Sequence, residues 1–379
     1  MPSIELKSFA LAAAIGLAVA GPAHAGPALL YDATSGQVLF ADDADQPWYP
    51  ASLTKMMTAY VVFNAWKTGK ASPDSKIIIS PRANAQPKMR LGLGGGKEIT
   101  FNDAIAAIIV KSANDIALAL AEAVGGTEEA FVAEMNDTAQ RLGMYATHYI
   151  NPHGLPGEGQ YTTAQDLAIL AQAIQRDFPQ HMHFFSMTMA EIGKRMIATH
   201  NSILLRVEGG DGMKTGFTCS AGYNIVASAT RNGRRIVAIV LGETSSGKRT
   251  IRTASLLEYG FRILEWKALF PAPVIESLPE GTYDRELVRT ANLTTRYKDC
   301  VAPVPEATVA AAGDPARAAM GPDGKPIVTA AVVPDKTAAP AKKAKPKTNR
   351  TAKTTAKRRN TKKRASEVEA GAQFSLASP

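Results

Sequence analysis

A serine and a lysine one helical turn apart are the residues of this sequence best suited to covalent chemistry. They are Ser52 and Lys55, and they open an apolar stretch, Met56–Trp66, that predicts a buried helix. Pro50 favours a first helical turn, and Gly69 stands where the helix would end. Residues three apart on a helix share one face. Since a serine hydroxyl needs a neighbouring base to become a nucleophile, Lys55 is the candidate base.

A lysine can act as a base only when it is neutral. The ordinary lysine pKa is about 10.4, and lowering it by about three units costs roughly 4 kcal/mol. Burial, a second cation and a helix N-terminus all lower it. The chain therefore has to surround Lys55 with a buried site that contains another positive charge.

Two further motifs accompany this pair. Ser112-Ala113-Asn114 lies between two predicted helices, Asn102–Val110 and Asp115–Val124, and Lys214-Thr215-Gly216 lies just before a predicted strand. Together they form the S-x-x-K, S-x-N and K-T-G set found in penicillin-binding proteins and class A β-lactamases.

Single motifs of this kind are weak signals, because two of them recur here. S-x-x-K also occurs at 245–248, where a loop is expected, and K-T-G also occurs at 67–69, at the end of the first helix. The order of the three motifs, their wide spacing and their local contexts are what point to an active site.

The chain resembles the serine D-alanyl-D-alanine carboxypeptidases, the low-molecular-mass penicillin-binding proteins. The likeness extends beyond the motifs to the segments 211–216, 221–229 and 259–262, and covers roughly residues 26 to 266. The resemblance implies the transpeptidase fold shared by penicillin-binding proteins and β-lactamases. It also implies removal of the terminal D-alanine from peptidoglycan stem peptides, inhibition by β-lactams, and neither a metal nor another cofactor.

The resemblance assigns a role to each motif residue near the nucleophile. Ser52 would be acylated, Lys55 would take its proton, and Ser112 would relay a proton to the leaving group. Asn114 would hold the substrate amide and Lys55, although it could instead be an ordinary helix cap.

Five other positions are expected to bind the substrate. Lys214 supplies the second cation, Thr215 and Gly216 belong to the substrate-binding strand, and the backbone N–H of Phe217 forms an oxyanion hole with that of Ser52. Arg249 would face the substrate carboxylate or, alternatively, be an exposed helix residue.

Three other functions stay open on sequence alone. A DD-endopeptidase would use the same residues on cross-links. A β-lactamase needs efficient deacylation, and no E-x-x-x-N segment stands at a suitable place. A non-catalytic wall-binding module would bind stem peptides without turnover.

The periodicity predicts an α/β (α+β) fold, with an antiparallel sheet flanked by helices. One sheet can form only if the N-terminal hairpin pairs beside the late strands. Helices fill the middle of the chain, a strand region is expected over 182–196, and a helix over 253–266 closes the body. The strands that frame this fold are predicted at 28–31, 37–40, 223–230 and 236–241, the last two joined by Asn232-Gly233.

Four segments are expected along the chain: a signal peptide (1–25), a catalytic domain (26–268), a short connection (269–306) and a disordered basic tail (307–379). Residues 301–379 carry 15 Lys/Arg and 6 Asp/Glu, a net charge of +9 that equals that of the whole chain, so the remainder is neutral. The protein is thus expected in the periplasm or cell envelope, with no transmembrane or amphipathic C-terminal anchor and no nucleic-acid partner. The tail either contacts an anionic wall polymer or membrane surface, or is simply solvated.

The cysteines and histidines give little further information about disulfides, metal sites or the active site. Cys219 and Cys300 could pair, but sequence gives no connectivity. His181 and His183 lack an evident third metal ligand. His153 either borders the cleft or stabilises a turn.

Overall fold

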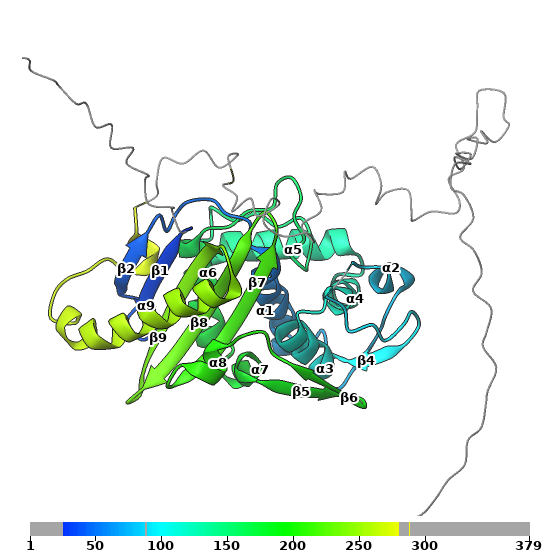
Figure 1. The fold of residues 1–379 in the computed structure, drawn as a ribbon. Coiled ribbons are helices and arrows are strands. Elements are labelled where there is room, and N and C mark those ends of the chain that lie inside the picture. The colour runs from blue at the N-terminus through cyan, green and yellow to red at the C-terminus, as the bar shows by residue number, and fades with distance from the viewer. Residues whose placement is uncertain (1–25, 88, 280–287, 289–379) are drawn as a thin grey trace, which may run out of the picture. The chain divides into compact units, whose positions relative to one another are not determined.

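A five-stranded antiparallel sheet is the centre of the molecule (Figure 1). The computed structural model describes residues 26–87, 89–279 and 288. The sheet order is β2-β1-β9-β8-β7, so β7 is an edge strand. Its strands are β1 (Ala28–Asp32), β2 (Val38–Asp42), β7 (Gly210–Thr218), β8 (Gly222–Arg231) and β9 (Arg234–Glu243).

The N-terminal hairpin pairs with the last strand, as the sequence predicts. β1 runs antiparallel to β9, from Ala28 opposite Val240 to Asp32 opposite Ile236. Alternate side chains of β9 enter two different cores: Ala238 lies in one, and Val237 and Ile239 lie in the other. Because successive side chains of a strand point to opposite faces, an apolar run of this kind requires helices on both sides.

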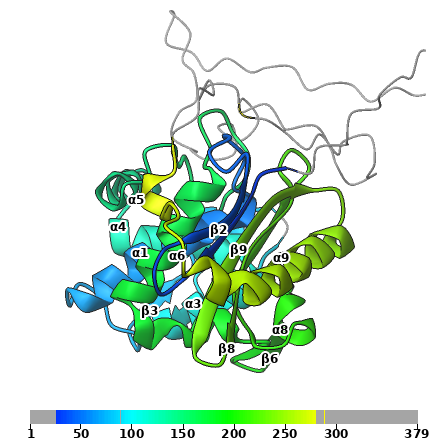
Figure 2. The same ribbon diagram turned by 90° about the vertical axis from the view of Figure 1, so that its left-hand side faces the viewer.

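Helices cover both faces of the sheet (Figure 2). α9 (Ser246–Lys267) packs on one face through Leu257 and Leu264. α6 (Ala164–Asp177) and α1 (Thr54–Lys67) belong to the larger core on the other face. α1 is buried along most of its length, as expected of a helix that is apolar on every side.

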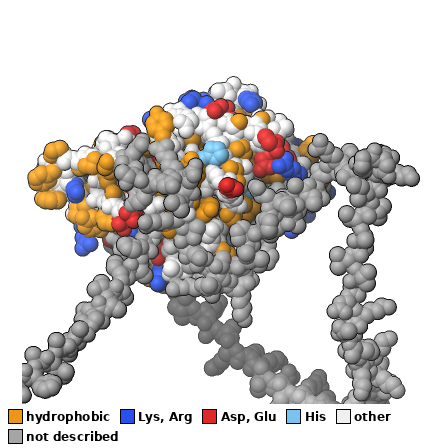
Figure 3. All heavy atoms as spheres, turned by 90° about the horizontal axis from the view of Figure 1, so that it is seen from above, with side chains coloured by type: hydrophobic (Ala, Val, Ile, Leu, Met, Phe, Trp, Pro, Cys, Tyr) orange, Lys and Arg blue, Asp and Glu red, His pale blue; other side chains and the backbone are white. Residues whose placement is uncertain are grey.

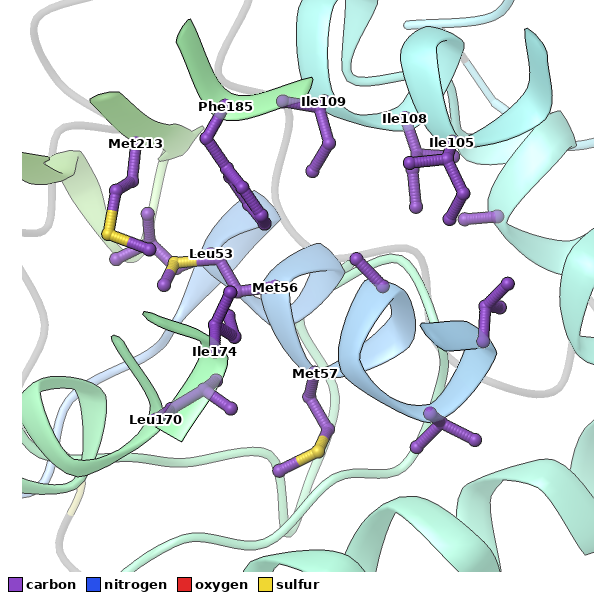
Figure 4. Packing of buried hydrophobic residues seen from close by; sticks show 14 of the residues in the cluster. Leu53, Met56, Met57, Ile105, Ile108, Ile109, Leu170, Ile174, Phe185 and Met213 are labelled. Carbon is purple, nitrogen blue, oxygen red and sulfur yellow. The ribbon is translucent and has the colours of Figure 1, made fainter. Parts of the chain in front are cut away.

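Side chains from four parts of the chain meet around α1 (Figure 4). Met56 of α1 lies beside Ile174 of α6, and Phe185 of α7 (His183–Ser186) points toward the same part of α1. The helical side of the molecule also contains α3 (Phe101–Ala106), the π-helical segment η2 (Ala107–Lys111), α4 (Asn114–Gly125) and α5 (Glu128–Leu142).

The remaining elements are short. They are the strand pairs β3 (Lys76–Ile78) with β4 (Glu98–Thr100) and β5 (Met189–Ile192) with β6 (Arg195–Ala198), the helices α2 (Pro81–Asn84), α7 (His183–Ser186) and α8 (Ile203–Arg206), and the turns η1 (Ala51–Leu53), η3 (Pro179–His181) and η4 (Ile275–Ser277).

Some predicted elements differ from the structure. Lys214-Thr215-Gly216 lies inside the strand β7 and not just before a strand. The strand region expected from residue 182 begins instead with α7, which buries both Phe184 and Phe185; only its second half forms the β5–β6 hairpin. The closing helix starts at Ser246 and not at 253, because the hydroxyl of Ser245 caps it by accepting the N–H of Lys248 at 3.1 Å.

The predicted signal peptide and basic tail lie outside the described residues, as do Cys300 and most of the connection after residue 268. Within 26–87 and 89–279, the structure contains no helix with the length and apolar character that crossing a bilayer requires.

Candidate active site

Ser52 lies in the tight turn η1, immediately before α1. The residue before it, Ala51, has the left-handed φ of +49°. A loop from a distant part of the chain packs against this turn: a Cβ at Gly154 would lie 1.9 Å from the carbonyl oxygen of Ala51. Gly154 itself has a φ of +84°, so both its conformation and its surroundings demand glycine.

Lys55 is fully buried, and its amine touches three oxygen atoms. Nζ lies 3.0 Å from Oγ of Ser52, 2.7 Å from Oδ1 of Asn114 and 2.7 Å from the carbonyl oxygen of His153. Amide and carbonyl oxygens only accept hydrogen bonds. A neutral Lys55 therefore donates its two N–H groups to Asn114 and His153, and its lone pair faces the hydroxyl of Ser52.

The surroundings of Lys55 favour this neutral form. Burial lowers its pKa well below the ordinary value, and the positive charge of Lys214 lowers it further, against a smaller opposing effect of the Asp115 carboxylate. The two requirements that the sequence imposes on Lys55, burial and a second cation, are both met.

Lys214 reaches the site from the edge strand β7. Its Nζ donates to Oγ of Ser112 at 3.0 Å and to the carbonyl oxygen of Thr215 at 2.9 Å. Burial, followed by the charge of Arg249, lowers the pKa of Lys214 to about 7. Ser112 joins η2 to α4 in a left-handed conformation, with a φ of +63°. A non-glycine residue held this way is strained, and such strain is common at functional sites.

The strand β7 passes very close to the nucleophile. A Cβ at Gly216 would lie 3.1 Å from the backbone nitrogen of Ser52, so a side chain there would push strand and turn apart. Thr215 is buried beside it, whereas Phe217 is 40% exposed and stacks on Tyr223, with ring centroids 4.2 Å apart. Phe217 thus forms part of the lip of the site.

Arg249 is buried in the first turn of α9, so the expectation of an exposed helix residue is wrong. Its guanidinium donates to Oγ of Ser246 at 3.2 Å and, at 3.4 Å, to the carbonyl oxygens of Asn224 and His200. Among the described residues, its buried Nε has no hydrogen-bond partner. Burial lowers the pKa of Arg249 to about 10, and its charge in turn acts on Lys214.

Two contributors to the site have no motif of their own. One is the carbonyl group of His153, which fixes Lys55. The other is the buried carboxylate of Asp115, which accepts the N–H groups of Leu91 and Gly92 at 2.9 and 2.8 Å. Asp115 directly follows Asn114, so these two bonds tie the first turn of α4 to the segment that contains Leu91 and Gly92. Its position next to the S-x-N motif is the one sequence signal that could have indicated it.

Asn114 is not the cap of α4, because the N-cap position belongs to Ala113. The second S-x-x-K sequence, at 245–248, begins a helix and not the expected loop, yet its Lys248 is exposed. The second K-T-G sequence ends α1, with Gly69 in a left-handed conformation. Burial of the lysine therefore distinguishes the copy of each motif that lies in the candidate site from the second copy.

Metal-binding clusters of three or more His, Cys, Asp or Glu side chains do not occur in the described part of the chain. His181 stacks on Phe63 at 4.6 Å between ring centroids, as part of the aromatic core beside α1.

Residues 17–245 match the peptidase S11 family, described as D-alanyl-D-alanine carboxypeptidase. The chain belongs to this family. This match includes all three motifs and stops just before Arg249.

Named relatives agree with the family assignment. The chain is 38% identical over 242 residues to the D-alanyl-D-alanine carboxypeptidase DacA of Haemophilus influenzae. The aligned region covers 62% of each protein. Penicillin-binding protein 5 of the same organism has a similar structure, with a TM-score of 0.61 and 37% identity over 63% of this chain and 71% of that one. Penicillin-binding protein D2 of Listeria monocytogenes, solved in an ampicillin-bound form, matches with a TM-score of 0.56 and 31% identity, over 62% of this chain and 97% of that one. The chain thus spans about three fifths of the length of the curated relatives it matches first.

Proposed function

We propose that the protein is a serine-type D-alanyl-D-alanine carboxypeptidase that shortens peptidoglycan stem peptides through an acyl-enzyme on Ser52. The observation that carries this proposal is the environment of Lys55. Its buried amine has a lowered pKa, and in the neutral form its one lone pair faces the hydroxyl of Ser52. A serine and a base in this arrangement perform acyl transfer.

The first half of the reaction forms the acyl-enzyme. Oγ of Ser52 attacks the carbonyl carbon of the penultimate D-alanine while Lys55 takes the hydroxyl proton. The peptide C–N bond then breaks, and a proton passes through Ser112 to the nitrogen of the departing D-alanine. In the second half, water attacks the carbonyl carbon of the ester while Lys55 accepts its proton. The bond between that carbon and Oγ of Ser52 then breaks, Lys55 returns the proton to Oγ, and the shortened peptide leaves with a free carboxylate.

Recognition of the substrate rests on its negative terminus. Lys214, Thr215 and Arg249 offer two cations and a hydroxyl to the terminal carboxylate, and Arg249 still has a buried N–H to donate. Asn114 holds the substrate amide as well as Lys55. Gly216 lets the strand approach Ser52 so closely that the N–H groups of Ser52 and Phe217 can both face the developing oxyanion.

β-Lactams present a strained amide and a carboxylate to the same groups, so they are expected to acylate Ser52. The signal-like segment 1–25 supports export, and hence a place in the periplasm or cell envelope where peptidoglycan is found. The boundaries at residues 25, 268 and 306, and contact of the basic tail with an anionic surface, are part of this proposal.

Release of D-alanine from a soluble peptide ending in D-Ala-D-Ala tests the proposal. The whole exported chain is compared with Ser52→Ala and with Lys248→Ala, which changes the exposed lysine of the second S-x-x-K sequence. We expect release by the wild type and by Lys248→Ala, and none by Ser52→Ala.

No release by a folded wild type would reject the carboxypeptidase. Cleavage of cross-linked muropeptides by that same preparation would then establish the endopeptidase. Binding of stem peptides without cleavage of either substrate would establish a wall-binding module. Rapid, repeated hydrolysis of a penicillin would instead indicate a β-lactamase.

A further inference from the structure

A polar cavity of about 590 Å³ lies between α6 and the turns at one end of the central sheet. Its walls come from the β1–β2 turn, α6, the β8–β9 hairpin and η4, and they share no residue with the candidate active site. They contain two guanidinium groups, one carboxylate and two amides, those of Arg176, Arg235, Glu276, Gln172 and Gln175. Because such groups are poor partners for an apolar ligand, the cavity suits a small ligand that carries charge.

Both guanidinium groups are held by carboxylates and still have hydrogen-bond donors to offer. Arg176 donates from Nε and Nη2 to Asp177, at 2.8 and 2.9 Å. Arg235 donates from Nε and Nη2 to Asp211, at 3.1 and 2.7 Å. In neither arginine does Nη1 bond to another described residue. An arginine fixed in this way loses little freedom when its remaining N–H groups bind a carboxylate.

Glu276 is the carboxylate of the cavity, and it lies near both cations without pairing with either. The pKa of Arg176 is raised first of all by its bond to Asp177, and the charge of Glu276 adds to this rise. The pKa of the buried Tyr31 is raised mostly by burial, and the charges of Glu276 and Arg235 act on it in opposite directions. Yet the salt bridges of both arginines are with other carboxylates, and Glu276 has none in the described part of the chain. A gap therefore remains between opposite charges, and a ligand with one charge of each sign fits it.

One face of α6 supplies three of these groups. Gln172, Gln175 and Arg176 stand three and four positions apart, so their side chains share that face. A Cβ at Gly36, in the β1–β2 turn, would lie 3.2 Å from Nε2 of Gln172 and 3.7 Å from Oε2 of Glu276. The amide of Gln172 and the carboxylate of Glu276 thus approach the same point, and an amide there can bond to a ligand that pairs with Glu276.

Charge on the surrounding surface is local. The chain before residue 301 has no net charge. Among the coloured atoms of Figure 3, acidic and basic side chains occur in small mixed groups and not in one large patch. A charged ligand is therefore selected by individual groups such as those of the cavity, and not by a broad electrostatic field.

We propose that this cavity binds the zwitterionic head of an α-amino acid, with the carboxylate of the ligand on Arg176 and Arg235 and its ammonium group on Glu276. Hydrogen bonds between charged groups of this kind are among the strongest in proteins. Two sources could supply such a head: the D-alanine that the proposed reaction releases, or the free end of a diamino acid within a stem peptide. The choice between these sources rests on the proposed function, whereas the binding itself does not.

Isothermal titration calorimetry of the chain from residue 26 to residue 379 tests the proposal without turnover. The probes are D-alanine and meso-diaminopimelate. N-acetyl-D-alanine lacks the ammonium group, and D-alaninamide lacks the carboxylate. Glu276→Gln and Arg176→Gln each remove one charge from the cavity. Their matched controls are Glu265→Gln and Arg262→Gln, which change exposed residues of α9, and circular dichroism confirms that all four variants fold.

We expect the wild type and both controls to bind at least one of the two amino acids, and each cavity variant to bind it about tenfold more weakly or less. The two derivatives that lack one charge should bind the wild type with a similar loss. Binding of D-alanine would identify the released product as a ligand, and binding of meso-diaminopimelate alone would identify the stem peptide.

Amino-acid binding that both cavity variants retain would overturn the proposal and assign the ligand to another site, such as the one around Ser52. Equal binding of D-alanine and its N-acetyl derivative would overturn it because the ammonium group would then have no role. No binding of either amino acid by the folded wild type would overturn it too. None of these outcomes depends on peptide cleavage, so they are distinct from a failure of the proposed function.

Discussion

At the scale of single residues, the proposed site depends on the amine of Lys55. Its hydrogen-bond partners leave it one role, which is to accept a proton from Ser52. Oδ1 of Asn114 and the carbonyl oxygen of His153 can only accept hydrogen bonds from Lys55, at 2.7 Å each. Ser52 alone can give it a proton. Burial and the charge of Lys214 lower the pKa of Lys55, which favours the neutral form that the proposed base requires.

Lys55→Arg tests this role with a long side chain that stays positively charged. An arginine cannot be deprotonated in a protein, so it cannot take the proton of Ser52. We expect kcat/KM for D-alanine release to fall by a factor of about 10² to 10⁴, the usual contribution of a general base. Lys248→Arg is the matched control and should leave the rate unchanged. A Lys55→Arg variant that keeps more than about a tenth of the wild-type rate would contradict the assignment.

Lys214 makes a prediction about stability and pH. Its folded pKa of about 7 lies below the ordinary 10.5, so the unfolded chain binds more protons between these values. The free energy of unfolding contributed by Lys214 therefore rises as pH increases from about 7 towards 10.5, and is lost again as pH falls to about 7. Urea unfolding of the wild type and of Lys214→Met, at pH 7 and pH 9.5, isolates this effect. The wild type should gain stability relative to the variant at the higher pH; an unchanged difference would mean that Lys214 is not desolvated.

At the scale of elements, three segments distant in sequence converge on the turn that holds Ser52. The loop 151–154 packs on Ala51 at Gly154 and presents the His153 carbonyl group to Lys55. The strand β7 approaches from another side at Gly216. Glycine at both contacts allows backbone to meet backbone, which places the catalytic groups more closely than side-chain packing would allow.

Gly154→Ala should disrupt this convergence. The new Cβ would meet the carbonyl oxygen of Ala51, so the turn or the loop must move and Lys55 loses its alignment. We expect a loss of kcat/KM of about 10² or more, as small displacements of catalytic groups have large effects.

Gly143→Ala controls for backbone strain alone. Gly143 has the same left-handed φ, +85°, but nothing lies within 4 Å of its Cβ position. This control should cost about 1 kcal/mol of stability and leave the activity of the folded protein intact. If both variants lost activity equally, strain and not the contact with Ala51 would be the cause.

At the scale of the whole molecule, local sequence patterns predicted much of the fold. Asn232-Gly233 joins β8 to β9 as predicted. The prediction that the N-terminal hairpin pairs beside the late strands is also confirmed, because β1 pairs with β9. The three motifs meet as their order suggested: Lys55 contacts Asn114, and Lys214 contacts Ser112. Each of these features has a local signature, a turn or a short run of residue types.

The features that sequence reasoning missed depend on distant packing. The carbonyl group of His153 belongs to the backbone, 98 positions from Lys55 in the sequence. No residue type in the sequence therefore indicates this contact. The burial of Arg249 depends on where α9 crosses the sheet, and its own neighbours in sequence are polar. α7 forms inside an expected strand because Phe184 and Phe185 are both buried, and β alternation would have exposed one of them.

Covalent capture by a penicillin tests the central claim most directly. The chain from residue 26 to residue 379 is treated with benzylpenicillin, and the labelled residue is located by mass spectrometry of the intact protein and of its peptides. The account predicts one penicilloyl group, attached to Ser52, absent from Ser52→Ala and formed far more slowly in Lys55→Arg. Absence of the label from the folded wild type, or its attachment to a different residue such as Ser112 or Ser245, would contradict the account.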